Sequence, residues 1–478
     1  MEKNKKYRNH ISVIFQKVIR TAGIAIFVFV SRFITDMEEA PGIKDLLMIL
    51  AIVLACVVLS FVVYCIMWAK TYFYIQDEVL ILEKNTLNKK KNTIGLKNIS
   101  NVNLEQSLLQ MALGTCTLKL DTNTLTTADQ TDVSIVLKKK DAEKFRIYLL
   151  GQQETVKEVV SNEKSENAFT ASSKEILLHG LFSMNLLSLL VLAGAVASAW
   201  GVLLELKEVE AASKMESLLT AGMILIVAGG MVWKVVKEFL RYLDFSIERK
   251  EDKVYLQYGI IKRVAYSIPV EKINAVRLNQ TLVARIAKRY MVEVVNVGMG
   301  NEEEEKHSFF LPYGKKEKIK EQLHVLLPEF EMELDESGDR PAKGVFAVWF
   351  ANGMLWVGSV ALAASIAAEF LQQEIAMVLA VTIVIAIYIF ILRWTAYRTE
   401  QIKIGNDWIQ IVQGHFGRYI LLVKCEKIQF LTMKQCVIAK KYGIAKGQIH
   451  VLAPAENQIH NLPYMKEEKM NELKKALL

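Results

Sequence analysis

Long uncharged runs and short alternating segments take turns along this chain, and the two patterns predict different structures. The clearest uncharged run covers residues 46–68, and about 20 apolar residues suffice for a helix to cross the hydrocarbon core of a bilayer. Further runs become long enough once tilt and flanking residues are counted, and they lie at 18–36, 176–204, 217–233, 344–368 and 375–392. Because the runs fall into close pairs, we predict three helical hairpins in the membrane.

The first run has two interpretations. Its apolar stretch is short and is followed by Arg32, although a long arginine side chain can reach the interface from within a span. A basic start before a short apolar stretch is also typical of a signal peptide, but no small-residue cleavage site precedes Asp36. We therefore expect this segment to be retained as a membrane helix.

One phrase recurs after each hairpin, as "KNISNVNLEQSLLQ" at 97–110, "EKINAVRLNQTLVA" at 271–284 and "EKIQFLTMKQCVIA" at 426–439. In each copy an isoleucine precedes a glutamine by seven positions, giving the pairs Ile99 and Gln106, Ile273 and Gln280, and Ile428 and Gln435. Apolar alternation before the phrase predicts strands. A short apolar helix, more strands and an amphipathic closing helix follow it. The spacing of about 155 to 175 residues suits whole duplicated domains.

These patterns predict a multi-pass α-helical membrane protein with about six spans and three cytoplasmic α+β domains. Each domain is expected to be a small antiparallel β barrel or sandwich with a C-terminal helix. The predicted parts are a basic segment with the first hairpin at 1–70, a domain at 71–152, a polar linker at 153–175, a second hairpin at 176–240, a domain at 241–328, an acidic linker at 329–343, a third hairpin at 344–394 and a domain at 395–478.

Composition agrees with alternating membrane and water-soluble parts. The chain has 478 residues, of which 52% are hydrophobic and 23% charged. Its net charge of +8 is spread over many segments, so no nucleic-acid partner is expected. The five cysteines are scattered, which predicts neither a disulfide framework nor a zinc site.

The distribution of lysine and arginine predicts the orientation. Basic residues gather at the N-terminus and at the exits of the second, fourth and sixth spans, whereas the turns inside the hairpins carry few. Short cytoplasmic segments hold an excess of such residues. Both termini and all three domains are therefore expected in the cytoplasm of a cell-membrane protein.

Two sets of residues are candidates for a site. The repeated glutamines are interpreted chiefly as structural residues that bond backbone groups at a strand-to-helix junction, and ligand contact is the alternative. Basic residues before the phrase are candidate contacts of anionic lipid head groups, unless they only reflect the positive-inside rule. They are Lys89, Lys90, Lys91, Lys262, Arg263 and Arg418.

Catalytic chemistry has little support in the sequence. Neither H-E-x-x-H nor G-x-S-x-G occurs, and no phosphate-binding loop is complete. His179 near the entry of a span has a functional interpretation, and an interfacial position is the other. We expect no enzyme activity, no catalytic residue, no cofactor and no metal.

The first copy follows the pattern I-x-x-V-x-x-x-Q-S-L-L-Q-x-x-L-G from Ile99 to Gly114. A membrane hairpin followed by strands and this phrase resembles the bacterial membrane-flanked domain family, which has a pleckstrin-homology-like (PH-like) fold. The second copy departs from the pattern with Lys288 at the glycine position, and the third keeps Tyr442 and Gly443. The resemblance implies a smaller membrane protein of the same family as partner, and a link to resistance against bacteriocins or antimicrobial peptides. It carries over no functional residue.

Three functions are compatible with these observations. The favoured one is a membrane protein whose domains bind protein or lipid at the bilayer. A transporter or exporter component is an alternative, although coupled transporters usually keep charged residues inside their spans. A membrane enzyme is the second alternative, and the oligomeric state is open.

Overall fold

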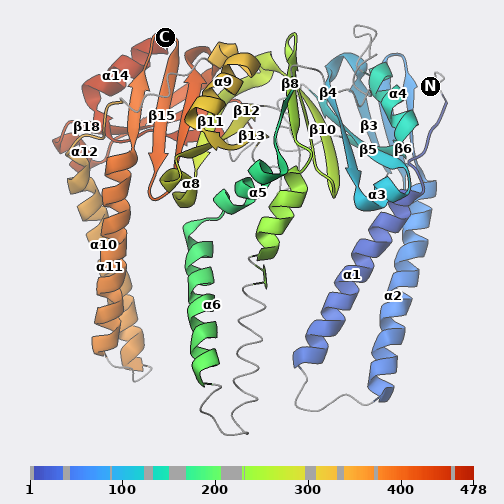
Figure 1. Ribbon diagram of the computed structural model, residues 1–478, viewed down its shortest axis with the longest axis horizontal. Helices are drawn as coiled ribbons and strands as arrows, with labels where there is room; N and C mark the ends of the chain where they lie inside the picture. The colour runs from blue at the N-terminus through green and yellow to red at the C-terminus, as the bar shows by residue number, and fades with distance from the viewer. Residues whose placement is uncertain are drawn as a thin grey trace. The chain divides into compact units, whose positions relative to one another are not determined.

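Apolar helices and antiparallel strands alternate along the chain (Figure 1). The computed structural model describes residues 5–35, 43–86, 89–122, 133–149, 168–205, 229–230, 232–296, 308–330, 338–370, 375–453 and 458–477. It divides into two compact units, of which the first is Met1–Glu166 with Gln257–Ser267 and the second is Asn167–Leu256 with Ile268–Leu478.

Helices α1 (Ser12–Thr35) and α2 (Ile43–Ala69) form the first hairpin, and α10 (Val345–Phe370) and α11 (Ile375–Thr399) form the third (Figure 1). Within the described residues, three stretches are long and apolar enough to cross a membrane, at Leu50–Ala69, Val345–Ile366 and Ala380–Thr399. The predicted number of six spans is not confirmed. The run at 217–233 lies almost entirely outside the described residues.

The run predicted as one span at 176–204 consists of two helices, α5 (Ser173–Phe182) and α6 (Leu186–Glu205). Ser172 and Glu175 form a capping box at the start of α5, and this helix packs on strand β13 of the second domain. Ile176 is fully buried there. The long apolar helix α6 therefore begins only at Leu186, and α5 packs on the second domain.

The first domain has two sheets and one helix around a common core. Its first sheet is β1 (Thr71–Gln76), β2 (Val79–Asn85) and β3 (Lys89–Gly95). Its second is β4 (Ile99–Ser107), β5 (Thr115–Thr122) and β6 (Val133–Lys138), with the short helix α3 (Leu108–Ala112) after β4 and the closing helix α4 (Lys139–Leu149). Phe73, Leu118 and Phe145 bring both sheets and α4 into one apolar cluster.

The other two copies repeat this order. The second has β8 (Ser246–Lys250), β9 (Lys253–Tyr258), β10 (Lys262–Pro269), β11 (Ile273–Gln280), α8 (Leu282–Ile286), β12 (Arg289–Asn296), β13 (Ser308–Lys315) and α9 (Lys316–Leu326). A two-residue strand, β7 (Phe169–Thr170), pairs with β8 and is not counted among its strands. The third has β14 (Gln401–Ile404), β15 (Trp408–Gly414), β16 (Arg418–Lys424), β17 (Ile428–Lys434), α12 (Val437–Lys441), β18 (Ile444–Val451), β19 (Ile459–Asn461), β20 (Met465–Lys466) and α14 (Glu467–Ala476). The predicted strands and closing helices are therefore confirmed.

The sheets do not close into barrels, which corrects one part of the predicted fold. β4 pairs with β10 of the second copy, and β11 pairs with β16 of the third. We call each such pairing, of the fourth strand of one copy with the third strand of the next, a strand joint. The strands of each copy form open sheets, and in the first two copies the edge of the fourth strand is taken by the next copy.

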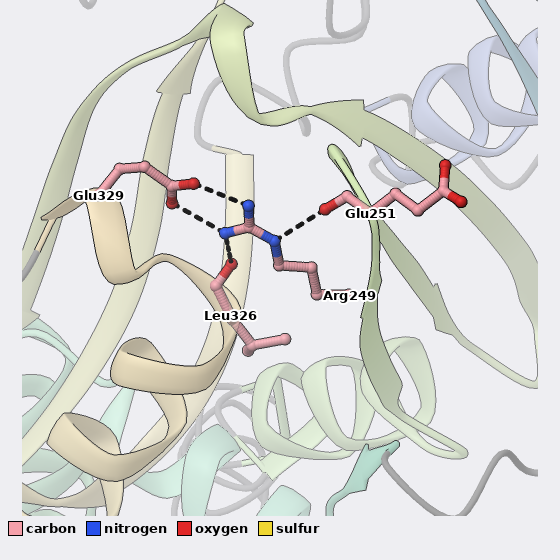
Figure 2. Close-up of polar contacts among 4 residues, drawn as sticks. All are labelled: Arg249, Glu251, Leu326 and Glu329. Carbon is pink, nitrogen blue, oxygen red and sulfur yellow. Dashed lines mark hydrogen bonds and ion pairs between the residues drawn. The ribbon is translucent and has the colours of Figure 1, made fainter.

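An arginine ties the closing helix of the second domain to its first sheet (Figure 2). Arg249 of β8 donates to both carboxylate oxygens of Glu329 at 2.7 and 2.8 Å. It also donates to the backbone oxygens of Leu326 and Glu251. Hydrogen bonding to Glu329 raises the pKa of Arg249, and the same bond lowers the pKa of Glu329. The fork-shaped guanidinium matches this bidentate arrangement.

Candidate functional site

The repeated glutamine has the same backbone contact in all three copies. The Nε2 atoms of Gln106, Gln280 and Gln435 donate to the backbone oxygen of the first residue of the following strand, at 2.8, 2.8 and 3.0 Å. These acceptors are Thr115, Arg289 and Ile444. Each glutamine thus holds the end of the fourth strand to the start of the fifth across the short helix.

The start of the short helix is capped by the residue after the glutamine. Ser107 caps α3 in a capping box with Gln110, Thr281 caps α8 and the Cys436 sulfur caps α12. We predicted that the glutamine bonds the unpaired backbone N–H groups at the helix start. In the structure the residue after the glutamine accepts a hydrogen bond there instead. At the other end of the fourth strand Ile99 and Ile273 are buried and Ile428 is partly buried.

The second strand joint brings together two residues that the sequence had singled out separately. The Arg418 Nε donates to the Gln280 Oε1 at 2.7 Å, and Arg418 also donates to the hydroxyl of Tyr290 at 3.3 Å. Gln280 is only 4% exposed, so both ends of its amide are satisfied inside the protein. A Cβ on Gly417 would lie 2.8 Å from the Gln280 backbone oxygen, so a glycine permits this close approach.

The first strand joint contains a buried cluster of opposite charges. The Glu105 carboxylate lies 2.6 Å from the Lys119 ammonium and 3.2 Å from the Lys262 ammonium. Its side chain is 7% exposed. Arg263 stands opposite Gln106 in the register of β4 and β10. Lys262 thus joins the copies through Glu105, as Arg418 does through Gln280.

The remaining candidate head-group contacts lie on β3. Lys89, Lys90 and Lys91 are exposed, and the Lys91 ammonium lies 3.5 Å from a Glu83 oxygen. The six basic candidates therefore do not form one patch, because Lys262, Arg263 and Arg418 stand in strand joints. Contact with lipid head groups stays a prediction, and it fits the exposed lysines of β3 best.

Several residues of the joints were not found from the sequence, notably Glu105, Lys119 and Tyr290. Arg285 of α8 is another, since it donates to the backbone oxygen of His415 at 3.1 Å. Their only sequence signal is position relative to the repeated glutamine. That signal becomes informative once the copies are known to pair with one another.

His179 lies in an aromatic pocket of the second domain. Its ring is 5.0 Å from the ring of Tyr242, 5.2 Å from that of Phe309 and 5.3 Å from that of Tyr313, measured between centroids. The backbone N–H of Tyr313 donates to its Nδ1 at 3.4 Å. Burial lowers the pKa of His179 to about 3. His179 is therefore a neutral core residue at physiological pH.

Within the described residues, no group of three or more His, Cys, Asp or Glu side chains is arranged to hold a metal ion. Burial raises the pKa of the Cys116 thiol to about 12, which keeps this side chain from acting as a thiolate nucleophile. The polar chemistry described above is that of strand pairing.

Comparison with known proteins agrees with the three-copy architecture. The model of the bacterial PH domain family matches residues 25–153, 187–325 and 353–478, and the chain belongs to this family. One relative is the UPF0699 transmembrane protein YdbT of Bacillus subtilis (strain 168), which is 21% identical over 408 residues, or 81% of this chain and 80% of the relative. No solved structure matches. The chain is thus a membrane protein of the YdbT type with three PH-like domains.

Proposed function

We propose that this protein is a non-enzymatic membrane protein whose three PH-like domains rest on the cytoplasmic leaflet and bind anionic lipid there. In this proposal six helices cross the membrane and both termini are cytoplasmic. The observation that carries it is the short helix after the repeated glutamine, which lies beside a membrane hairpin and exposes apolar side chains in each copy.

The short helices lie at the membrane end of the domains. Ala439 of α12 packs against Val345 and Val348 at the start of α10. In the second copy, the Thr281 hydroxyl donates to the Phe182 backbone oxygen at 2.5 Å, a few residues before α6 begins. In the first copy, Thr115 just after α3 has its hydroxyl 3.5 Å from that of Ser12, where α1 begins.

Large apolar side chains stand out from these helices. Val437 of α12 is 88% exposed, Ile286 of α8 is 77% exposed and Leu108 of α3 is 56% exposed. Such exposure in water is unfavourable by about 25 cal/mol for each Å². The boundary between head groups and acyl chains removes that cost, as it does for interfacial helices.

The exposed lysines of β3 lie at the same end of the first domain. Thr71 follows α2 almost directly and pairs with Lys84, which in turn pairs with Lys90. Two strand spacings therefore separate Lys90 from the end of the membrane helix, or roughly 10 Å. Each basic residue so near an anionic leaflet contributes about 1 kcal/mol of attraction.

Fluorescence quenching by lipid tests this proposal. We would place a fluorophore on Val437→Cys in the full chain, with the other cysteines replaced, and reconstitute it in nanodiscs that contain brominated lipid. A matched label on Lys474→Cys reports on α14, which lies at the opposite end of the third domain from α10 and α11 (Figure 1). We expect quenching at 437 and none at 474. Equal quenching at the two positions would contradict interfacial docking.

The lysines are tested separately, with the label on Leu108→Cys. The label should be quenched more strongly by brominated lipid in anionic phosphatidylglycerol than in phosphatidylcholine, because it lies deeper in the bilayer. The double substitution Lys89→Ala and Lys90→Ala should abolish that difference. Lys97→Ala, in the turn just after the far end of β3, is the control. No dependence on lipid charge would remove the head-group contact from the proposal.

The interaction role extends to protein partners. A smaller membrane protein of the same family and a part in resistance to antimicrobial peptides belong to the proposal as well, and both rest on the resemblance alone. A sealed-liposome flux assay separates this role from transport. Solute movement by the purified chain without any partner would count against the proposed function.

A further inference from the structure

The two strand joints use the same register. Arg263 of β10 lies opposite Gln106 of β4, and Arg418 of β16 lies opposite Gln280 of β11. The two arginines hold the same place in their strands, six residues before the last, because β10 ends at Pro269 and β16 at Lys424. The outer edge of a fourth strand is therefore built to receive the third strand of a following copy.

β17 is the fourth strand of the third copy. Among the described strands it pairs with β18 alone. Phe430 is 52% exposed and Met433 is 37% exposed, whereas the equivalent residues of β11, Ala275 and Leu278, are fully buried. An open strand edge with apolar side chains is a template for another strand.

β3 is the complementary edge at the other end of the series. It is the third strand of the first copy, and in the part of the chain that the structure describes it pairs with β2 alone. Lys89 stands six residues before the end of β3 at Gly95. It therefore holds the place of Arg263 and Arg418.

We propose that the outer edge of β17 binds β3 of a second molecule of this protein, in the register of the strand joints. Gln435 then lies opposite Lys89 of the second molecule. Its Nε2 already donates to Ile444, while no described residue donates to its Oε1. In the second strand joint the equivalent oxygen of Gln280 accepts from Arg418, and the Lys89 ammonium supplies that donor in the new joint, which leaves Lys90 and Lys91 as the head-group contacts of an assembled chain.

Lys440 adds a second equivalence. It holds the place in α12 that Arg285 holds in α8, where Arg285 donates to the His415 backbone oxygen in the turn before β16. Lys440 is exposed. In the proposed joint it reaches the backbone oxygen of Thr86 of the second molecule, which stands three residues before Lys89 as His415 stands three residues before Arg418.

A second molecule is the occupant that the chain itself supplies, because the described strands include an open edge of each kind. The contact is head to tail, so repeated use closes a ring or extends a row in the plane of the membrane. One pair opposes it, since Lys434 lies opposite Lys90 in this register. In the first strand joint Glu105 holds the place of Lys434 and Val264 that of Lys90, so no like charges stand opposite each other there. Like charges opposite each other weaken strand pairing, so salt should strengthen this joint.

Site-directed disulfide formation in membranes tests the register. Two full-length chains with different tags would be co-expressed, one with Thr432→Cys and the other with Asn92→Cys, which lie opposite each other in the proposed joint. Cys425→Ala and Cys436→Ser remove the native thiols nearby, and serine keeps the cap of α12. The control replaces Asn92→Cys by Thr93→Cys, whose side chain points to the other face.

We expect a dimer with both tags for the pair 432 and 92, at about five times the yield of the control pair. Equal yields, no dimer, or a cross-link from position 432 to a different protein would overturn the proposal.

Charge reversal provides an independent test at an exposed position. Lys434→Glu places a carboxylate opposite Lys90 where two like charges met, so the dimer yield should rise about two- to tenfold. Salt should then lower the yield of the variant while it raises the yield of the parent pair. Lys434→Gln should give a smaller rise. A fall in yield with Lys434→Glu would overturn the proposed register.

Discussion

His179 makes the second domain sensitive to acid, and its burial sets the size of the effect. The pKa of His179 is about 3 in the folded domain and about 6.5 in an unfolded chain. Between these values the unfolded state binds a proton that the folded state does not. The free energy of unfolding therefore falls as the pH drops from about 6.5 towards 3.

At pH 5 the expected loss is about 2 kcal/mol relative to pH 7. This figure barely changes if the folded pKa is nearer 4, because the unfolded state dominates proton binding at pH 5. His179→Gln removes the titration, and its side-chain oxygen can accept from the Tyr313 N–H in place of Nδ1.

Hydrogen exchange followed by mass spectrometry measures the effect on the full chain in detergent. The most protected amides of β12 and β13 report on unfolding of the domain, and peptides from β5 in the first domain serve as an internal control. From pH 7 to pH 5, we expect the parent chain to lose about 2 kcal/mol more than His179→Gln. Other titrating groups cancel in this double difference. A difference below about 0.5 kcal/mol would refute the assignment of His179 as a neutral buried residue.

Three further predictions concern the joints, a turn and the arginine tie. Gln280→Ala should destabilise the second strand joint by about 2 to 3 kcal/mol, because it leaves a buried guanidinium and a carbonyl without partners. Gln435 is exposed, so Gln435→Ala should cost about 1 kcal/mol or less. Hydrogen exchange of β16 amides measures the effect of Gln280→Ala, and exchange of β18 amides measures that of Gln435→Ala. Gly114 has φ +62° with open space at the position of a Cβ, so Gly114→Ala should lower the free energy of unfolding by about 1 kcal/mol through backbone strain alone. Lys288 has φ +50°, so Lys288→Gly should raise the free energy of unfolding by about 0.5 kcal/mol. Thermal unfolding measures both changes. Glu329→Gln should lower the free energy of local unfolding of α9 by about 1 kcal/mol, a small value because the Glu329 side chain is 35% exposed. Hydrogen exchange of α9 amides measures this loss.

Each of these has a clear counter-result. Equal losses for Gln280→Ala and Gln435→Ala would mean that the arginine contact adds nothing to the joint. A neutral Gly114→Ala, or a destabilising Lys288→Gly, would contradict the strain assigned to positive φ. The pKa of Glu329 is lowered by Arg249, so the carboxylate contribution should be present above about pH 4.5 and decline below it. An α9 whose protection is insensitive to acid in that range would argue against the tie.

The elements of each domain were predictable because their patterns are local. Strand alternation, the phrase from Ile99 to Gly114 and the amphipathic closing helices each extend over fewer than about 20 residues. Lys288 was recognised as a departure from the glycine pattern, and the structure explains it as a residue held at positive φ like Gly114 and Gly443.

The pairing between copies could not be predicted in the same way. β10 and β16 have the same alternation whether they pair within their own copy or with the preceding one, and the choice depends on contacts over more than a hundred residues. Hydropathy also missed the break between α5 and α6, because "LFSMN" joins two apolar helices without a charge. Lys262 and Arg418 were interpreted as surface residues because their partners, Glu105 and Gln280, are far away in the sequence.

The strand joints also have a consequence for synthesis of the chain. Arg418 follows Gln280 by 138 residues, and a bacterial ribosome adds roughly 5 to 20 residues per second. The edge of β11 therefore waits roughly 7 to 28 s for its neighbour, a period in which the nascent chain has an open sheet beside the membrane. Slow translation between the second and third hairpins should thus favour aggregation, and a chaperone or a neighbouring copy that shields this edge should raise the yield of folded protein.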